Sequence, residues 1–333
     1  MEDMEDMEDM EDMEDMDLPA AAAPAASTQA FGRLRLIVDP RAGRRVQADV
    51  LPRLRAALEE LGVVHDVVTS TGAGAVERSA RSALEEGVRY LAAVGDDRTI
   101  HEVLGGMFDG ARPLAPEAVL GVVGVGTGSD FARNFGLDRP AEVVARHLST
   151  VNEMAIDVGT ADCIDAAGRR TQRVFGNVAQ VGYGAECVRR AARMPRALGR
   201  VRDLLAAYGA ILSLQRQETR VVVDHTAAVL PVVNLVIANC QFTGGGMKVA
   251  PRALADDGRF NVQVFTGERS QVFLMTQKIY RGEHLPHPDI TEWQSATVSI
   301  TPPEPLPVEA DGQLLGVTPA TFGLLPLSLR LKI

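Results

Sequence analysis

The sequence predicts two domains: an α/β domain built on a parallel sheet, followed by a mainly antiparallel β domain. Strand and helix patterns alternate over residues 31–157, whereas short runs of alternating apolar residues dominate residues 158–320. Turns rich in glycine and aspartate follow two of the apolar runs in the first half. Alternating strands and helices are typical of a parallel sheet covered on both faces, with ligands bound at the carboxyl ends of its strands.

Apolar runs in the first half predict four buried strands, namely residues 34–39, 65–69, 90–95 and 119–125. Helical patterns lie between and after them. Residues 46–61 place Leu51 and Leu54 on one face of a helix, and a second helix is expected over residues 76–86. Thr99 opens a third helix directly after its strand.

The second half combines two helical patterns with several strand-like runs. Helices are expected over residues 185–193 and 198–214. The strand-like runs are residues 173–179, 221–224, 232–238, 259–265, 296–301 and 327–333. Alternation such as that of Phe260, Val262 and Val264 gives a strand one apolar face, which indicates an antiparallel sheet.

The negative charge of the chain is concentrated in its first residues. The net charge is −10, but residues 1–17 hold eleven of the 44 acidic residues, which leaves 33 acidic against 34 basic residues. Residues 1–30, acidic and then rich in Ala and Pro, lack apolar periodicity, so we expect a disordered tail. The rest shows little interleaving of aromatic and basic residues, so nucleic acid is not an expected partner.

Two turns that follow predicted strands have the composition of phosphate-binding loops. The first consists of Gly95, Asp96, Asp97, Arg98 and Thr99, and the second of Gly124 to Asp130. Such strand-to-helix turns present backbone N–H groups and a helix N-terminus to anions. A tight turn capped by Ser129 or Asp130 is the alternative. Neither turn is a P-loop, and the partial G-x-G-x-x-G pattern from Gly124 leaves a dinucleotide site as another alternative.

Six motifs follow one another along the chain. They are Asp-Pro-Arg-Ala-Gly (39–43), Gly-Asp-Asp-Arg-Thr-Ile-His-Glu-Val (95–103), Gly-Thr-Gly-Ser-Asp-Phe-Ala-Arg (126–133), Gly-Gly-Gly-Met (244–247), a segment ending in Asp-Asp-Gly (251–258) and Asp-Gly-Gln (311–313). This series resembles the diacylglycerol kinase catalytic-domain family, which includes bacterial soluble lipid kinases, sphingosine kinases and ceramide kinases. The resemblance covers residues 33–333.

The resemblance implies a fold and an activity. The fold is a Rossmann-like nucleotide domain (31–157), a β-sandwich-like lipid-binding domain (158–320), an active cleft between them, and a last strand (321–333) that returns to the first domain. The activity is an ATP- and Mg²⁺-dependent transfer of the γ-phosphoryl group to a hydroxyl of diacylglycerol or of a sphingoid or ceramide-type lipid. An NAD-kinase-like enzyme is a further alternative, against which the Gly-Gly-Gly-Met and Asp-Asp-Gly segments argue.

The resemblance also implies roles for individual residues. The implied nucleotide contacts are Asp39, Pro40, Gly43, Ser70, Gly95, Asp96, Asp97, Arg98, Thr99, Glu102, Gly126, Thr127, Gly128, Ser129 and Asp130. A Mg²⁺ is implied at Asp257 with the carbonyls of Leu254 and Arg259, where an acidic turn is the alternative. The family's proton acceptor is replaced by Gln313, which leaves Asp311 as the candidate.

Several positions depart from the family pattern. Asp96 and Arg98 replace glycines, Gln313 replaces a glutamate, and asparagines are replaced by Asp39, His101 and Ser129. Arg98 either offsets the charge of Asp96, by pairing with it or by reaching the phosphates, or blocks the site together with it. The alternative to an active kinase is therefore a weakened or inactive protein of this fold that binds lipid or nucleotide as a regulator.

The distribution of basic residues indicates how the protein could reach a lipid substrate at a membrane surface. Arg189, Arg193, Arg196 and Arg200 would form one basic stripe on a continuous helix, suited to an anionic membrane surface, although a solvated helix face is the alternative. No apolar run reaches the ~18 residues of a membrane helix. Three scattered cysteines without a C-x-x-C motif favour a reducing compartment. We expect a cytoplasmic protein that visits the inner face of the membrane; its oligomeric state is not indicated.

Overall fold

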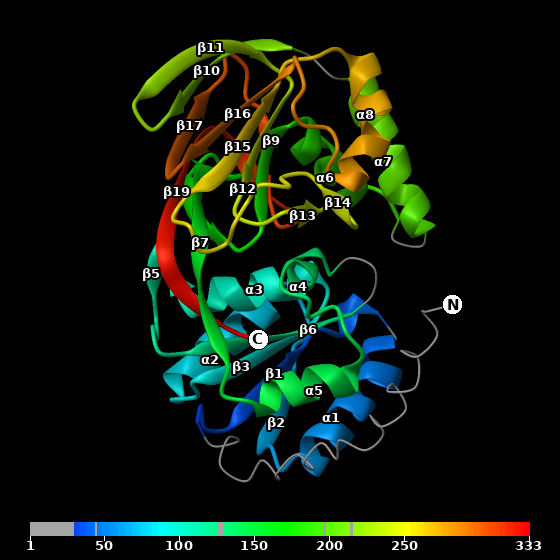
Figure 1. Ribbon diagram of the computed structural model, residues 1–333, viewed down its shortest axis with the longest axis vertical. Helices are drawn as coiled ribbons and strands as arrows, with labels where there is room; N and C mark the ends of the chain where they lie inside the picture. Colours follow the sequence, from blue (N-terminus) through cyan, green and yellow to red (C-terminus); the bar gives the residue numbers. More distant parts are fainter. Residues whose placement is uncertain (1–29, 44, 126–128, 196–197, 214–215) are drawn as a thin grey trace, which may run out of the picture.

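The computed structural model describes residues 30–43, 45–125, 129–195, 198–213 and 216–333. The predicted tail falls outside these ranges except for its last residue, and so do Gly126, Thr127, Gly128 and Arg196. Figure 1 shows two lobes stacked along the long axis. The first half of the chain forms the N-terminal lobe and most of the second half forms the C-terminal lobe.

The N-terminal lobe is a parallel sheet with helices on both faces, as predicted. Its strands lie in the order β6 (Val119–Gly124), β3 (Tyr90–Gly95), β1 (Leu34–Val38) and β2 (His65–Thr69). The helices are α1 (Leu51–Glu60), α2 (Ala75–Glu85), α3 (Asp97–Met107), α4 (Asp130–Asn134) and α5 (Ala141–Ser149). Short elements are a 3₁₀ turn (Pro40–Ala42), a π turn (Val46–Val50), β4 (Phe108–Asp109) and β5 (Arg112–Pro113).

Side chains of the parallel strands alternate between two buried cores. In β1, Leu36 and Val38 face the core that contains Leu54 of α1, whereas Ile37 faces the core that contains Val103 of α3. Helices α2 and α3 cover one face of the sheet, and α1 and α5 cover the other. Both faces are therefore closed to water, and only the ends of the strands remain for a ligand.

The C-terminal lobe is mainly antiparallel, as predicted. Its strands are β8 (Arg170–Phe175), β9 (Val178–Gly182), β10 (Gln217–Val223), β11 (Thr226–Val232), β12 (Asn234–Ala238), β15 (Phe260–Phe265), β16 (Ile290–Ser295), β17 (Thr297–Thr301) and β18 (Pro307–Ala310), with a hairpin of β13 (Phe242–Thr243) and β14 (Met247–Lys248). Its helices are α6 (Tyr183–Ala192), α7 (Arg200–Leu212) and α8 (Arg269–Arg281). The strands enclose a core that includes Phe175, Phe260 and Phe322.

Two long strands join the lobes. β7 (Glu153–Ile164) and β19 (Gln313–Lys332) pair antiparallel over most of their length, and both run between the lobes in Figure 1. The end of β19 also pairs parallel with β6, with Arg330 opposite Val119 and Leu331 opposite Leu120. The last strand therefore extends the sheet of the N-terminal lobe. Among the described residues, no helix is both long and apolar enough to cross a bilayer.

Some predicted elements were wrong. The run 173–179 is two strands, because β8 ends at Phe175 and β9 begins at Val178. Helices α5 and α8 and the strand β7 were not predicted. The start of α8 does carry a local signal, since Glu268 and Gln271 form a capping box.

Candidate active site

The loops that follow β1, β3 and β6 lie together at the carboxyl edge of the parallel sheet. The N–H of Asp39 donates to the carbonyl of Val94 (3.4 Å), and the N–H of Val125 donates to that of Gly95 (2.9 Å). These bonds continue the parallel pairing for one residue beyond the strands and hold each loop beside the next. The structure therefore brings the predicted glycine and aspartate turns to one edge.

A cluster of four charged side chains occupies this edge. The carboxylate of Asp39, which is fully buried, accepts hydrogen bonds from Nε of Arg41 (2.9 Å) and Nη2 of Arg98 (3.0 Å). Arg41 also donates from Nη2 to Glu102 (3.1 Å). The negative charges of two carboxylates are therefore offset by the positive charges of two guanidinium groups. A buried carboxylate requires such a partner because its charge is removed from water. Hydrogen bonding to Asp39 raises the pKa of Arg41 further above its usual value.

Arg98 does not pair with Asp96 in the structure, so that predicted compensation was wrong. Asp96 is the N-cap of α3, where its Oδ1 accepts from the N–H (3.1 Å) and the hydroxyl (3.0 Å) of Thr99. The carboxylate thus satisfies free N–H groups at the helix start. Thr99 is fully buried with its hydroxyl donating to Asp96, and a nucleotide contact by Thr99 stays a prediction.

Asp97 links the second loop to the third. Its carboxylate accepts from the backbone N–H groups of Asp130 (2.8 Å) and Phe131 (3.0 Å), and so caps α4 from outside that helix. Ser129 occupies the N-cap position without a side-chain hydrogen bond to the helix, so the predicted cap by Ser129 or Asp130 was wrong. Burial raises the pKa of Asp97 to about 8, and the nearby charge of Asp130 adds to the shift.

Asp130 reaches from the third loop to the C-terminal lobe. Its Oδ2 accepts from the N–H of Gly245 (2.7 Å) and its Oδ1 from Nη1 of Arg133 (2.8 Å). Gly245 lies in the Gly-Gly-Gly-Met segment and has a positive φ of 84°, which suits glycine. The carboxylate of Asp130 therefore holds this turn of the C-terminal lobe against the N-terminus of α4.

The remaining predicted nucleotide residues serve mainly to shape the loops. Ser70 is buried and donates its hydroxyl to Ser79 (2.8 Å), which leaves it little access to a ligand. Pro40 begins the 3₁₀ turn, and Gly43 ends it with a φ of 117°. The hydroxyl of Ser129 is buried and has no hydrogen-bond partner among the described residues, which exclude the adjoining Gly126, Thr127 and Gly128.

Asp311 sits where the two lobes meet. Its carboxylate accepts from the N–H groups of Gly176 (2.9 Å), Asn177 (3.0 Å) and Val178 (3.1 Å) of the C-terminal lobe. Nδ1 of His101, on α3 of the N-terminal lobe, lies 3.0 Å from its Oδ2. This carboxylate therefore has four hydrogen-bond partners in the structure, and a catalytic role for Asp311 stays a prediction. Gln313 donates weakly to the carbonyl of Arg98 (3.4 Å).

The predicted metal residues form one turn. Asp257 accepts from the N–H of Arg259 (3.0 Å), as in the turn that was the alternative interpretation. No group of three or more His, Cys, Asp or Glu side chains is arranged for a metal in the part of the chain that the structure describes. The fully buried Asp157 holds this turn, since it accepts from the N–H of Gly258 (2.7 Å). Metal binding by Leu254, Asp257 and Arg259 stays a prediction.

Three important side chains were missed from the sequence. Arg41 occupies a position that varies in the first motif, yet a buried acid at Asp39 requires a nearby cation. His101 was noted as a departure but given no role. Asp157 has no local motif, because it accepts from the N–H groups of Gly258 and Leu327, which are 101 and 170 residues away.

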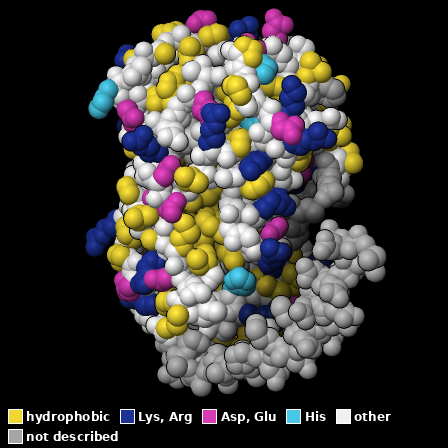
Figure 2. Space-filling model, in the orientation of Figure 1, with side chains coloured by type: hydrophobic (Ala, Val, Ile, Leu, Met, Phe, Trp, Pro, Cys, Tyr) yellow, Lys and Arg dark blue, Asp and Glu magenta, His cyan; other side chains and the backbone are white. Residues whose placement is uncertain are grey.

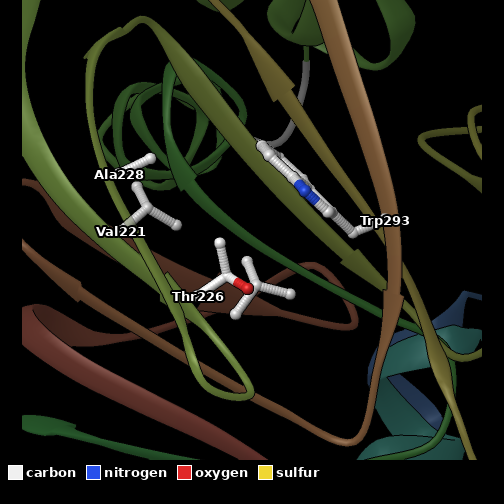
Figure 3. Close-up of a pocket in the computed structure, with 5 residues that line it drawn as sticks. Val221, Thr226, Ala228 and Trp293 are labelled. Atoms are coloured by element: carbon white, nitrogen blue, oxygen red, sulfur yellow. The ribbon is translucent and has the colours of Figure 1, made fainter.

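A hollow in the C-terminal lobe is unrelated to this site. It is lined by Val221, Val223, Thr226, Ala228 and Trp293, four of which are labelled in Figure 3. These residues belong to the β10–β11 hairpin and to β16, in the C-terminal lobe. The lining contains no charged side chain and only one hydroxyl, which gives phosphate nothing to bind.

Two family profiles match the chain. The diacylglycerol kinase catalytic domain matches residues 33–161, and the YegS C-terminal NAD kinase beta sandwich-like domain matches residues 177–333. The chain therefore carries a diacylglycerol kinase catalytic domain followed by a YegS-like C-terminal domain. The match places all three loops of the carboxyl edge in the kinase domain, and Asp311 in the sandwich-like domain.

Proteins named diacylglycerol kinase are similar to this chain over nearly its whole length. That of Bacillus subtilis (strain 168) is 26% identical over 292 residues, covering 87% of this chain and 92% of that protein. That of Mycobacterium tuberculosis (strain H37Rv) is 25% identical over 309 residues, covering 90% and 94%. A crystal structure of a diacylglycerol kinase from Bacillus anthracis (strain Sterne) has a TM-score of 0.65 at 20% identity, covering 91% and 97%, which shows the same fold.

Proposed function

We propose that this member of the family is an ATP-dependent lipid kinase that phosphorylates a hydroxyl of diacylglycerol or of a sphingoid or ceramide-type lipid. The observation that supports it most is the hydrogen bond between His101 and Asp311. It joins the lobe with the phosphate-binding loops to the lobe in which the lipid is expected. A hydroxyl and a γ-phosphoryl group must meet between two such parts for in-line transfer.

The nucleotide side of the proposal rests on the carboxyl edge. Helices α3 and α4 both begin there. The N–H groups of Thr99, Asp130 and Phe131 at these helix starts are bonded to Asp96 and Asp97, so phosphate would have to bind other groups of the edge. Arg41 and Arg98 add two guanidinium groups beside these helix starts. ATP enters as its Mg²⁺ complex, in which the ion neutralises charge on the phosphates. Burial raises the pKa of Asp97 at this edge, and an approaching cation favours its ionised form.

His101 is the proposed acceptor of the proton that the lipid hydroxyl loses. The lipid oxygen attacks the γ-phosphorus, the bond from that phosphorus to the bridging oxygen of ADP breaks, and the hydroxyl proton must leave. We assign the proton to Nε2 of His101, with Nδ1–H donating to Asp311. Asp311 is itself fixed by three backbone N–H groups, so it orients the imidazole. A carboxylate that orients a histidine base is a known solution to this problem.

The second candidate is a regulator that binds nucleotide or lipid without transfer. The observation that favours it is the Asp39–Arg98 ion pair, which fills part of the edge where the resemblance implies an asparagine and a glycine. Binding without turnover would be its signature.

The test is an ATP-dependent assay on purified full-length protein with diacylglycerol, sphingosine and ceramide in mixed micelles. We expect radiolabel from the γ-phosphate in one lipid product, dependent on Mg²⁺. Calorimetry with ATP and Mg²⁺ separates the two candidates: heat of binding without any labelled lipid supports the regulator. No binding at millimolar ATP contradicts both nucleotide-dependent functions.

A further inference from the structure

Helix α7 turns an apolar face toward solvent. Large apolar side chains that are 49–67% exposed recur along it at helical spacing, namely Val201, Leu204, Leu205, Tyr208 and Leu212. Their spacing of three and four residues places them on one side of the helix. Single exposed apolar residues are ordinary on protein surfaces, but a contiguous set on one helix marks an interaction site.

The fold does not require these side chains. The opposite side of α7 contains the buried Ala206 and Ala210, and it packs against α6. Small residues there let the two helices approach closely, and that contact anchors the helix. The exposed leucines and Tyr208 contribute little to it, so their apolar character needs another explanation.

The surroundings of this face are apolar and basic. Leu198, 41% exposed, precedes α7, and α8 beside it exposes Leu274 (71%). The helices in contact with α7 carry exposed cations, namely Arg193, at the end of α6, and Lys278 and Arg281 of α8. On the face seen in Figure 2, Lys and Arg side chains lie over the region where Figure 1 places α8.

The arginine stripe predicted from the sequence is not formed. Arg189 and Arg193 belong to the end of α6, whereas Arg200 begins α7, which is a separate helix packed against it. Arg189 and its neighbour Arg190 both pair with Glu186, with Nε–Oε distances of 2.6 and 2.7 Å. One of these two positive charges is therefore compensated within the helix.

We propose that the apolar face of α7 docks on an anionic lipid bilayer, with the flanking cations among the headgroups. This inference rests on the proposed function, in which the acceptor is a lipid. A helix lying in the interface presents Leu, Val and Tyr to the acyl boundary, and basic residues beside it add attraction to anionic lipid. Tyrosine suits this position because its apolar ring can contact the acyl chains while its hydroxyl remains hydrogen-bonded to water.

The position of α7 agrees with delivery of a lipid to the candidate active site. Helix α8 touches both α7 and β14, and the β13–β14 hairpin touches α4. Figure 1 shows α7 and α8 together at the outer side of the C-terminal lobe, on the same side as this hairpin. A continuous series of contacts thus leads from the docking face to the loop held by Asp130.

Charge favours a bilayer over a second copy of the chain as the occupant. In a symmetric dimer through this face, the cations on the helices beside it would approach their own counterparts, and like charges oppose association. Anionic headgroups complement the cations instead.

Vesicle co-sedimentation tests the proposal. Wild-type protein should sediment with vesicles of equal phosphatidylglycerol and phosphatidylcholine, and less with phosphatidylcholine alone. The triple variant Leu204→Ser, Tyr208→Ser, Leu212→Ser should bind at least about tenfold more weakly, since each lost apolar contact removes on the order of a few-fold. The matched control is Val64→Ser with Val229→Ser, two side chains of similar exposure (59% and 63%) elsewhere, which should bind as wild type does.

Two outcomes would overturn the docking face. One is a triple variant that sediments as well as wild type. The other is a wild-type dimer in light scattering that becomes monomeric in the triple variant while neither protein sediments, which would make the face an interface between copies.

The kinase proposal is judged separately, with a dispersed short-chain diacylglycerol. If the protein phosphorylates this soluble lipid but ignores vesicles, the function stands and the docking face is wrong. If it sediments through α7 but phosphorylates no lipid, the docking face stands and the kinase proposal is wrong. The triple variant should keep the wild-type rate on the dispersed lipid.

Discussion

Nη2 of Arg98 lies 3.0 Å from Oδ2 of Asp39, across 59 residues of sequence. Both positions depart from the family pattern, in which an asparagine and a glycine are expected. The two departures therefore form one ion pair, completed by Arg41. A third departure, His101, is likewise paired, with Asp311. These three departures are thus connected changes, each with a partner in the same site.

The Asp39–Arg98 pair should show strong coupling in a double-mutant cycle. Arg98→Gly and Asp39→Asn, alone and together, should give a coupling of about 1–3 kcal/mol in the free energy of unfolding, measured by urea titration. The control cycle uses Asp96→Asn with Arg98→Gly, which should be additive within about 0.5 kcal/mol because Asp96 bonds to Thr99. Coupling of Arg98 to Asp96 in place of Asp39 would contradict the structure.

Asp97→Ala should loosen the third loop. Two N–H groups at the start of α4 lose their acceptor, so we expect a loss of stability of about 0.5–2 kcal/mol and a weaker affinity for ATP. Thermal unfolding and calorimetry measure the two effects. The exposed Asp109→Ala, at the hairpin after α3, is the matched control and should change neither. Unchanged ATP affinity in Asp97→Ala would show that the nucleotide does not use this loop.

His101→Gln should lower kcat by about 10²–10⁴-fold with little change in the KM for ATP, because a positioned base is lost and binding groups are kept. Gln313→Glu in the His101→Gln background should restore part of the rate, since it returns a carboxylate to the family position. His147→Gln, on α5, is the control. A normal rate in His101→Gln would remove the histidine from the reaction.

Glu309→Gln should flatten the pH dependence of stability. Glu309 is buried on β18, and burial raises its pKa to about 8. The folded state therefore holds a proton that the unfolded state releases above about pH 4.5. Stability from this group is complete at lower pH and is lost as pH rises toward 8, at no more than about 1.4 kcal/mol per pH unit. Urea titrations from pH 5 to pH 8 should show a smaller slope in the variant; equal slopes would show that Glu309 is ionised when buried.

The N-terminal lobe was predictable because its signals are local. The run 90–95 was predicted as a strand and is β3, since a buried parallel strand needs only a short apolar run followed by a turn. The C-terminal lobe was less predictable from its sequence. The break at Gly176 and Asn177 exists because their N–H groups turn to Asp311, which is 135 and 134 residues further along. No pattern within a single run contains that information.

Long-range contacts also limited what the sequence could predict about the candidate active site. Motifs located the loops, but they did not identify the partner of each side chain. Asp96 is close to Arg98 in sequence, yet residues two apart at a helix start point in different directions. Asp39 is remote in sequence and adjacent in space because β1 and β3 are neighbours. Side-chain partners of this kind follow from strand order, which the sequence only implied.

The placement of β19 has a consequence for how the protein is made. β19 lies between β6 and β7, yet the ribosome synthesises it after both of them. While the C-terminal lobe is being synthesised, β6 has a free edge, with backbone groups available to any other strand. The N-terminal lobe therefore cannot finish folding as an independent unit ahead of the rest. During that interval the free edge of β6 can pair with strands of other chains, which is a route to aggregation.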